Sequence, residues 1–129
     1  MASGKSTVIE EGKVFIFDKP LYWTAFDLVN KIRIMIKNIL GLKNVKVGHA
    51  GTLDPLASGL MIICTGNATR KIEEYRNLDK EYVAEIYLGA TTPSCDLETE
   101  INERFSIEHI TNELVLEVLS RFTGEQEQV

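Results

Sequence analysis

Two short apolar runs set the framework of this chain. Residues 14–17 read VFIF and residues 60–65 read LMIICT, and both are bounded by turn residues, so both are predicted to be buried strands. A helix is predicted between them, because Thr24 can cap it, Asp27 stands in the third position of a capping-box variant and Gly41 can end it. Its apolar stripe comprises Phe26, Val29, Ile32, Ile36 and Leu40. The chain is therefore expected to be a mixed α/β protein.

Further elements alternate less evenly along the rest of the chain. A short helix is predicted from the capping residue Asn67 to about Arg76, a strand over 81–88 and a polar loop over 89–99. A last helix is predicted over about 112–122. Its stripe comprises Leu114, Val115, Val118, Leu119 and Phe122, and Gly124 follows it.

Composition indicates one globular domain. The chain has 129 residues, of which 44% are hydrophobic and 26% are charged, which suits a single soluble domain with a modest core. No internal repeat or linker divides it. We expect residues 1–12 to form a disordered segment and residues 13–129 to form the domain.

Neither the membrane nor an oxidising compartment is indicated. Apolar runs such as residues 60–64 are far shorter than the roughly 20 residues that span a bilayer, and the N-terminus lacks the apolar block of a signal peptide. Cys64 and Cys95 stand in different contexts and are too few for a disulfide framework or a zinc cluster. We expect a cytoplasmic protein with reduced thiols.

Charge is distributed unequally. The net charge is −5, yet residues 13–80 hold eleven Lys and Arg against six Asp and Glu, while residues 81–129 hold two against eleven. A basic half gathered on one face could follow a phosphate backbone. Two ordinary solvated surfaces explain the same counts, so charge alone leaves both readings open. Arg33 and Lys37, one helical turn apart with Lys31 nearby, are expected to form a basic outer face of the first helix.

The stretch GHAGTLDPLASG, residues 48–59, places a single acidic residue, Asp54, in a small-sided loop. Pro55 favours an extended backbone at Asp54, and the flanking glycines permit sharp turns and close approach of a ligand. The following apolar run would fix one end of the loop on the scaffold, as a catalytic group requires. Asp-Pro is also a common turn initiator, so a purely structural role of Asp54 stays open at this point.

Other chemistries fit the sequence poorly. Gly4-Lys5-Ser6-Thr7 lacks the glycine and the strand that precede a phosphate-binding loop. His49, Asp54 and Ser58 supply the residue types of a hydrolase triad without its nucleophile elbow. His49 with Asp54 would give a metal ion only two ligands.

Several blocks together resemble a known family. The segment GHAGTLDPLASGLMIICTGNATRKI closely resembles the signature of the TruB-type tRNA pseudouridine synthases, in which this loop carries the catalytic aspartate. The segments FDKPLYWTAFDLVNKIR, DKEYVAEIYLGATTPSCDLETE and RFTGEQEQV resemble further blocks of that family, in the same order. The loop LGATTPSCDLETE is more similar to the bacterial stand-alone enzymes than to the relatives that work inside guide-RNA particles.

The resemblance implies a fold, a reaction and a site. The fold would be the pseudouridine synthase fold, a mixed α/β (α+β) architecture with a largely antiparallel sheet and flanking helices, incomplete in this chain. The reaction would isomerise a uridine of tRNA, at position 55 of the T-loop, without cofactor, metal or protein partner. Asp54 would be the catalytic residue. The implied substrate-binding residues are His49, Tyr82, Gly51, Thr52, Leu53, Lys19 and Pro20, and weaker candidates for phosphate contacts are Lys46, Arg70, Lys71 and Lys80.

Three qualifications accompany the resemblance. Leu21-Tyr22-Trp23 stands where the family has a residue and then glycine before its Thr or Ser, so a differently shaped turn is expected there. The chain is expected to be the N-terminal part of a catalytic domain, with little synthase activity by itself. The competing hypothesis is a non-catalytic RNA-binding or scaffold module of the same fold, in which Asp54 only shapes a turn.

Overall fold

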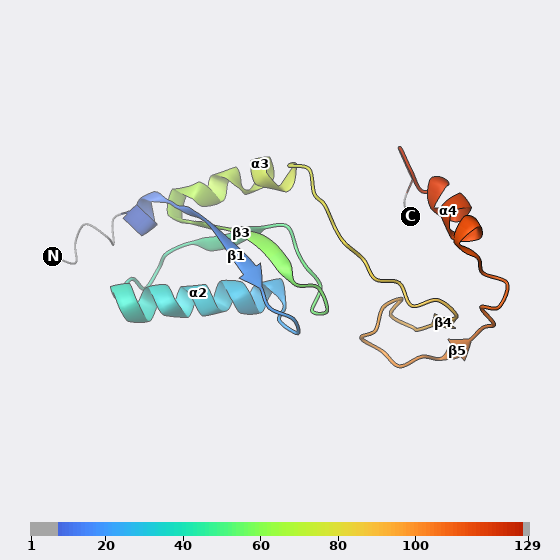
Figure 1. Cartoon of the computed structure of the whole chain (residues 1–129). Helices are drawn as coiled ribbons and strands as arrows, with labels where there is room; N and C mark the ends of the chain where they lie inside the picture. Colours follow the sequence, from blue (N-terminus) through green and yellow to red (C-terminus); the bar gives the residue numbers. More distant parts are fainter. Residues whose placement is uncertain (1–7, 128–129) are drawn as a thin grey trace. The chain divides into compact units, whose positions relative to one another are not determined.

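The structure is a computed structural model that describes residues 8–127 and divides the chain after Tyr82 into two compact units (Figure 1). The elements of the first unit are β1 (Val14–Lys19), α2 (Ala25–Leu40), β2 (Val47–Ala50), β3 (Gly59–Thr65), the 3₁₀ helix η1 (Gly66–Lys71) and α3 (Ile72–Arg76). Those of the second unit are β4 (Ala90–Thr91), β5 (Glu103–Arg104) and α4 (Asn112–Ser120). No helix within the described residues is both long and apolar enough to cross a membrane.

An antiparallel sheet in the order β1-β3-β2 forms the centre of the first unit. Ile63 of the central strand is opposite Phe15 of β1 and His49 of β2, so these three side chains share one face. The expected antiparallel sheet with flanking helices is thus confirmed for this part of the chain. Strand β1 runs two residues beyond the predicted 14–17, and β2, which was not predicted, occupies the start of the GHAG stretch.

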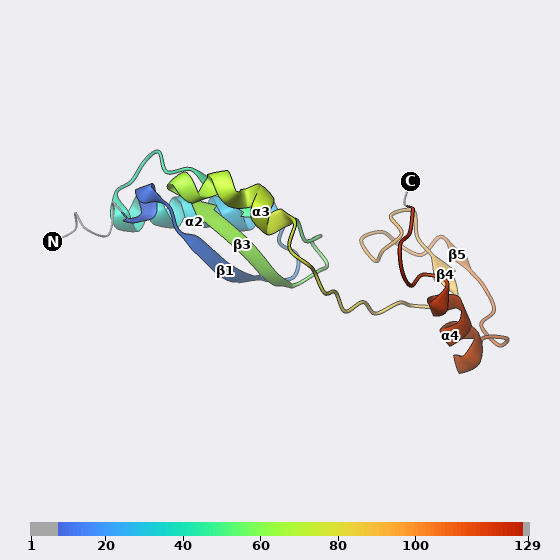
Figure 2. The same ribbon diagram turned by 90° about the horizontal axis from the view of Figure 1, so that it is seen from above.

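Helix α2 covers one face of this sheet and supplies most of the core. Figures 1 and 2 show α2 and α3 on opposite sides of the strands. The buried core residues are Ala25, Leu28, Val29, Ile32 and Ile36 of α2, Val47 of β2, and Met61 and Ile63 of β3. On the other face, a Cβ at Gly48 would lie 2.7 Å from Cδ1 of Ile72, so the absence of a side chain lets α3 approach β2.

The predicted boundaries of α2 are confirmed in detail. Thr24 accepts a hydrogen bond from the backbone N of Asp27 at 3.1 Å, and the Asp27 carboxylate accepts one from the backbone N of Thr24 at 2.8 Å. This reciprocal pair is a capping box, and Gly41 closes the helix at φ +71°. The buried stripe differs from the predicted one at its start, because Ala25 and Leu28 face the sheet while Phe26 is 66% exposed.

The turn after β1 places Tyr22 in a backbone conformation that normally favours glycine. Tyr22 has φ +66°, in the left-handed region, where a residue with a Cβ is disfavoured by about 1–2 kcal/mol. The expectation of a turn shaped differently from that of the family stays a prediction. The tyrosine adopts the left-handed conformation that is normally accessible to glycine.

The N-terminal segment is partly structured. The expected disorder of residues 1–12 falls in part on residues 1–7, which lie outside the described residues, as does the Gly4–Thr7 motif. Residues 8–11, in contrast, form a helical turn, and Ile9 packs against the core. The hydroxyl of the fully buried Thr65 donates to the carbonyl O of Ile9 at 3.1 Å and accepts from the backbone N of Lys13 at 3.0 Å. These bonds hold the segment against the end of β3.

The helical region after β3 begins earlier than predicted. It starts at Gly66, with Thr65 rather than Asn67 at the N-cap position, and it is 3₁₀ before it becomes α-helical. No side-chain hydrogen bond caps it. The predicted end at Arg76 is confirmed.

The chain from residue 81 onward contains less regular structure than the sequence predicts. Residues 81–87 form no strand, because a strand needs a partner for its backbone groups and none pairs with them within 8–127. The predicted polar loop 89–99 holds the short strand β4, which pairs with β5. Helix α4 begins as predicted, capped by Thr111, and ends at Ser120, two residues early. None of its apolar stripe is fully buried.

The capping box of α2 gives a stability prediction. Thr24→Ala removes the side-chain acceptor for the N-terminal turn and should lower the free energy of unfolding by about 1 kcal/mol at neutral pH. Hydrogen bonds from the Thr24 side chain and backbone lower the pKa of Asp27. The stabilisation from ionised Asp27 is therefore present above its unfolded-state pKa and is lost as the pH falls through the lower folded-state pKa.

Urea unfolding of the chain at neutral and acidic pH measures both effects. Thr52→Ala is the matched control, because Thr52 is exposed and its hydroxyl makes no hydrogen bond within the described residues. Asp27→Asn should weaken the pH dependence over that range. A Thr24→Ala variant as stable as the Thr52→Ala control would contradict the capping role.

Candidate active-site loop

The loop that carries Asp54 joins β2 to β3. It leaves β2 after Ala50 and enters β3 at Gly59, so its two ends belong to neighbouring antiparallel strands. Gly51 and Gly59 have φ of +103° and +131°, conformations that residues with side chains rarely adopt. The glycines predicted to permit sharp turns are therefore required by the backbone at both ends.

Backbone contacts fix the middle of this loop. The N–H of Ala57 donates to the carbonyl O of Asp54 at 2.9 Å, which closes a turn over 54–57. The N–H of Tyr22 donates to the carbonyl O of Pro55 at 2.7 Å, which joins the loop to the turn after β1. Leu53 is half-buried and packs against the core. The residues on both sides of Asp54 are thus anchored.

The carboxylate of Asp54 is exposed. Its oxygens make no hydrogen bond and no ion pair within residues 8–127, and the turn uses only the main-chain oxygen of this residue. A buried or capping aspartate would accept bonds from neighbouring N–H groups, as Asp27 does. The loop therefore presents the carboxylate to solvent from a fixed backbone.

Lys19 lies beneath the neighbouring turn. It is fully buried, and its Nζ donates to the carbonyl oxygens of Pro20 at 3.0 Å and Trp23 at 2.6 Å. The Cα atom of Lys19 is paired with that of Gly59 in the sheet, so the backbone of this residue lies beside the end of the Asp54 loop. It organises the turn of residues 20–23, and Pro20 itself is exposed. Lys19 makes no ion pair with Asp54.

His49 has a fixed ring orientation at the start of the loop. Its Nδ1 is 2.5 Å from the carbonyl O of Gly51, and because a carbonyl can only accept, Nδ1 carries the proton. Nε2 is then the ring atom left for another partner. The side chain is half-buried, so the sequence-predicted histidine stands in strand β2, next to the glycine that opens the loop.

Tyr82 is not joined to this loop by any hydrogen bond of the described residues. It is the last residue of the first unit and is exposed in a segment without regular structure. Thr52 is also exposed. The structure therefore brings together Gly51, Leu53, Asp54, His49, Lys19 and Pro20, through the contacts above, and leaves Tyr82 apart.

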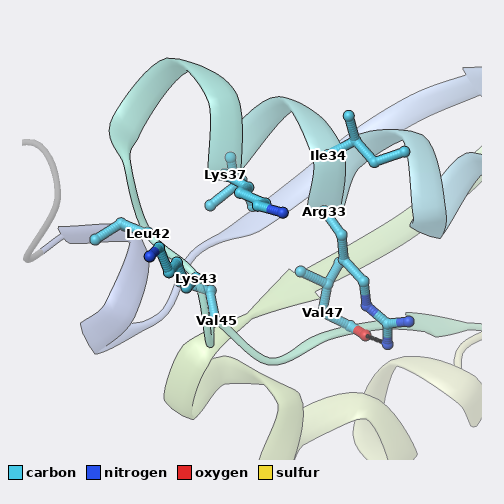
Figure 3. Close-up of a pocket in the computed structure, with 8 residues that line it drawn as sticks. Arg33, Ile34, Lys37, Leu42, Lys43, Val45 and Val47 are labelled. Atoms are coloured by element: carbon cyan, nitrogen blue, oxygen red, sulfur yellow. Dashed lines mark hydrogen bonds between the residues drawn. The ribbon is translucent and has the colours of Figure 1, made fainter.

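The basic residues are spread over the first unit. Lys46, Arg70 and Lys71 are exposed, whereas Nζ of Lys80 donates to the carbonyl oxygens of Arg76 and Leu78. An open pocket of about 140 Å³ lies between α2 and the segment that leads into β2. Figure 3 shows the side chains that line it. Its lining comprises Arg33, Ile34, Ile36, Lys37, Leu42, Lys43, Val45 and Val47. Arg33 there donates to the carbonyl O of Val47 at 2.8 Å, so it is not wholly free on the outer face of the helix as predicted.

Two features of the first unit were not predicted. The bond from Tyr22 to Pro55 joins residues far apart in sequence, and only the unusual Tyr-Trp pair before Thr24 hinted at this turn. The pocket depends on Lys43 and Val45, which carry no recognisable motif.

Burial raises the pKa of the Cys64 thiol, which fits a core residue. Within the described residues, no three His, Cys, Asp or Glu side chains are grouped to hold a metal ion.

Known proteins match this chain both in the Asp54 loop and in the helices and strands around it. Residues 37–129 match the TruB family pseudouridylate synthase N-terminal domain. The chain is 62% identical over 120 residues to the tRNA pseudouridine synthase B of Phocaeicola vulgatus, covering 93% of this chain and 51% of that protein. It is 56% identical over 118 residues to the protein of the same name from Parabacteroides distasonis, covering 92% and 50%.

A more distant relative gives the same result. The tRNA pseudouridine synthase B of Flavobacterium johnsoniae is 53% identical over 119 residues, covering 92% of this chain and 52% of that protein. The chain thus spans about half the length of the curated relatives it matches. With most of its length matched by the family's N-terminal domain, the chain belongs to the TruB family of pseudouridylate synthases.

Proposed function

We propose that this chain forms the Asp54-bearing part of a tRNA pseudouridine synthase that acts on the uridine at position 55 of the T-loop. In this isomerisation the N1–C1′ bond of the uridine breaks, the base turns, and a C5–C1′ bond forms. The hydrogen on C5 is released to solvent and N1 gains a proton, so the product is an isomer of the substrate. We place this activity in the cytoplasm. The names of the relatives and the family's own description support the reaction class.

One observation carries the assignment of Asp54. The turn over 54–57 is closed by the backbone oxygen of Asp54, and the carboxylate remains exposed without a partner among residues 8–127. A turn-shaping role would use that carboxylate. An anchored loop that presents an unused carboxylate suits a nucleophile or a base, which needs a fixed position and a free lone pair.

The other residues of the loop would support binding. His49, held through Nδ1, would present its ring to the RNA, and the absence of a side chain at Gly51 would let an RNA backbone approach the loop closely. Thr52 and Leu53 would form the part of the binding surface next to Asp54, and Leu53 is anchored in the core. Lys19 and Pro20 would form the floor, because Lys19 holds the adjacent turn in place.

The target base must leave its RNA loop to meet Asp54. Flipping a base out costs a few kcal/mol, which stacking in a protein pocket can offset. Tyr82 is our candidate for stacking on the flipped uracil, at about 1–3 kcal/mol per base. The exposed cations Lys46, Arg70 and Lys71 would contact phosphates on the same RNA.

Substitution of Asp54 separates this proposal from the alternative of a non-catalytic RNA-binding module. Asp54→Asn should abolish pseudouridine formation, because it removes the charge with almost no change in volume. It should leave stability within about 0.5 kcal/mol, since the exposed side chain makes no hydrogen bond within the described residues. The assay uses this chain fused to the remaining half of the Phocaeicola vulgatus relative, called the extended enzyme here.

Asp79→Asn is the control, because Asp79 is also exposed and lies outside the loop. It should retain the activity of the extended enzyme. Activity retained by Asp54→Asn, with Asp79→Asn equally active, would favour the non-catalytic role of Asp54.

The basic half should give RNA binding a steep salt dependence. Affinity for tRNA should fall by roughly 0.7–0.9 log units per log of salt for each phosphate contact. Arg70→Gln should reduce the slope by about one such step. Arg104→Gln, the same charge change in the acidic half, should leave it unchanged. An affinity for tRNA that does not change with salt concentration would contradict the proposed phosphate contacts.

The 129-residue chain should have little synthase activity by itself. Asp54 has no cationic partner within residues 8–127, and Ile16 and Leu60 remain exposed on the sheet face away from α2. Release of tritium from tRNA labelled at uridine C5 compares this chain with the extended enzyme. Equal turnover by the two would show that residues 1–129 contain everything the chemistry needs.

A further inference from the structure

Tyr22 combines a disfavoured backbone with an exposed ring. It is at φ +66°, and its side chain is 78% exposed. Asn or Gly would adopt this backbone at lower cost. The ring packs into no core cluster, and its hydroxyl makes no hydrogen bond within the described residues. The fold of the first unit therefore does not need a tyrosine at this position.

The position of Tyr22 links it to the Asp54 loop. Its N–H donates to the carbonyl O of Pro55, the residue that follows Asp54, at 2.7 Å. On the other side, the buried Nζ of Lys19 holds the carbonyl oxygens of Pro20 and Trp23, the residues on either flank of this turn. The backbone of Tyr22 is thus held from two directions beside the loop that presents the carboxylate.

An exposed aromatic ring on a fixed backbone is a stacking surface for unpaired bases. Base–aromatic stacking tolerates any base, because each has a π-face. Strain retained at one residue is typical of functional positions, where the side chain contributes something that the fold alone does not require.

We propose that Tyr22 is a substrate-binding residue that stacks on an unpaired base of the RNA loop next to the uridine at Asp54. This inference rests on the proposed function, since RNA is the ligand. It adds a second aromatic contact, on the β1 side of the Asp54 loop, to the one assigned to Tyr82. Tyr22 binds substrate and takes no part in bond breaking.

Binding and melting measurements on the full chain test this contact. The probe is a fluorescein-labelled hairpin RNA with a T-arm sequence, and the variants are Tyr22→Phe, Tyr22→Asn and the control Asp79→Asn. Tyr22→Phe keeps the ring and should bind like wild type. Tyr22→Asn should weaken binding about 5- to 150-fold, which corresponds to 1–3 kcal/mol of stacking at 1.4 kcal/mol per tenfold, while its melting temperature stays equal or rises. Asp79→Asn, an exposed position outside the Asp54 loop, should bind the hairpin like wild type.

The outcomes separate this inference from the proposed function. Wild-type affinity in Tyr22→Asn would overturn the stacking role and leave the assignment of Asp54 intact. A loss of affinity accompanied by a lower melting temperature would also overturn it, because Tyr22 would then act through the fold. No binding of the hairpin by the wild-type chain would overturn this inference together with the RNA-binding part of the proposed function.

Discussion

The packing of α2 against β3 is the contact on which the rest of the first unit depends. Met61 and Ile63 are almost fully buried beneath five residues of the helix, and side chains of this size contribute about 1.5–3 kcal/mol each when removed from water. Because β3 is the central strand, this contact also fixes β1 and β2 through their hydrogen bonds to it. The Asp54 loop begins and ends on two of these strands. Its position therefore follows from the core.

The candidate site is built almost entirely by the backbone. Glycines at both ends set the path of the loop, Leu53 anchors it, and hydrogen bonds from Ala57 and Tyr22 hold the carbonyl groups of Asp54 and Pro55. None of these contacts uses the carboxylate. A catalytic group is best held by bonds that leave its reactive atoms free, since such bonds do not compete with the substrate. Lys19 also leaves the Asp54 carboxylate free, because its Nζ donates to two carbonyl oxygens beneath the neighbouring turn.

The sequence pattern predicted those parts of the structure that depend on interactions between residues close together in the chain. The capping residues of α2, the middle of its buried stripe, the apolar run of β3 and the isolated aspartate between glycines were evident from spacing and residue type. Strand β2 was missed because four residues containing Gly and His carry almost no strand signal. Residues 81–88 alternate as a strand does, but a ladder also needs a partner, which the pattern within a segment cannot supply. The bond from Tyr22 to Pro55 and the burial of Lys19 depend on contacts formed only in the folded chain.

The buried hydroxyl of Thr65 has a consequence for handling the molecule. It holds residues 9 and 13 at one end of the β1–β3 ladder, whereas Lys19 and Gly59 pair at the other end, beside the Asp54 loop. At about 3.3 Å per residue, the five steps of β1 separate these ends by roughly 17 Å. A surface tether attached at Val8 would join this unit at the end of the ladder away from the loop. Immobilisation there would leave the exposed Asp54 at the opposite end of the ladder.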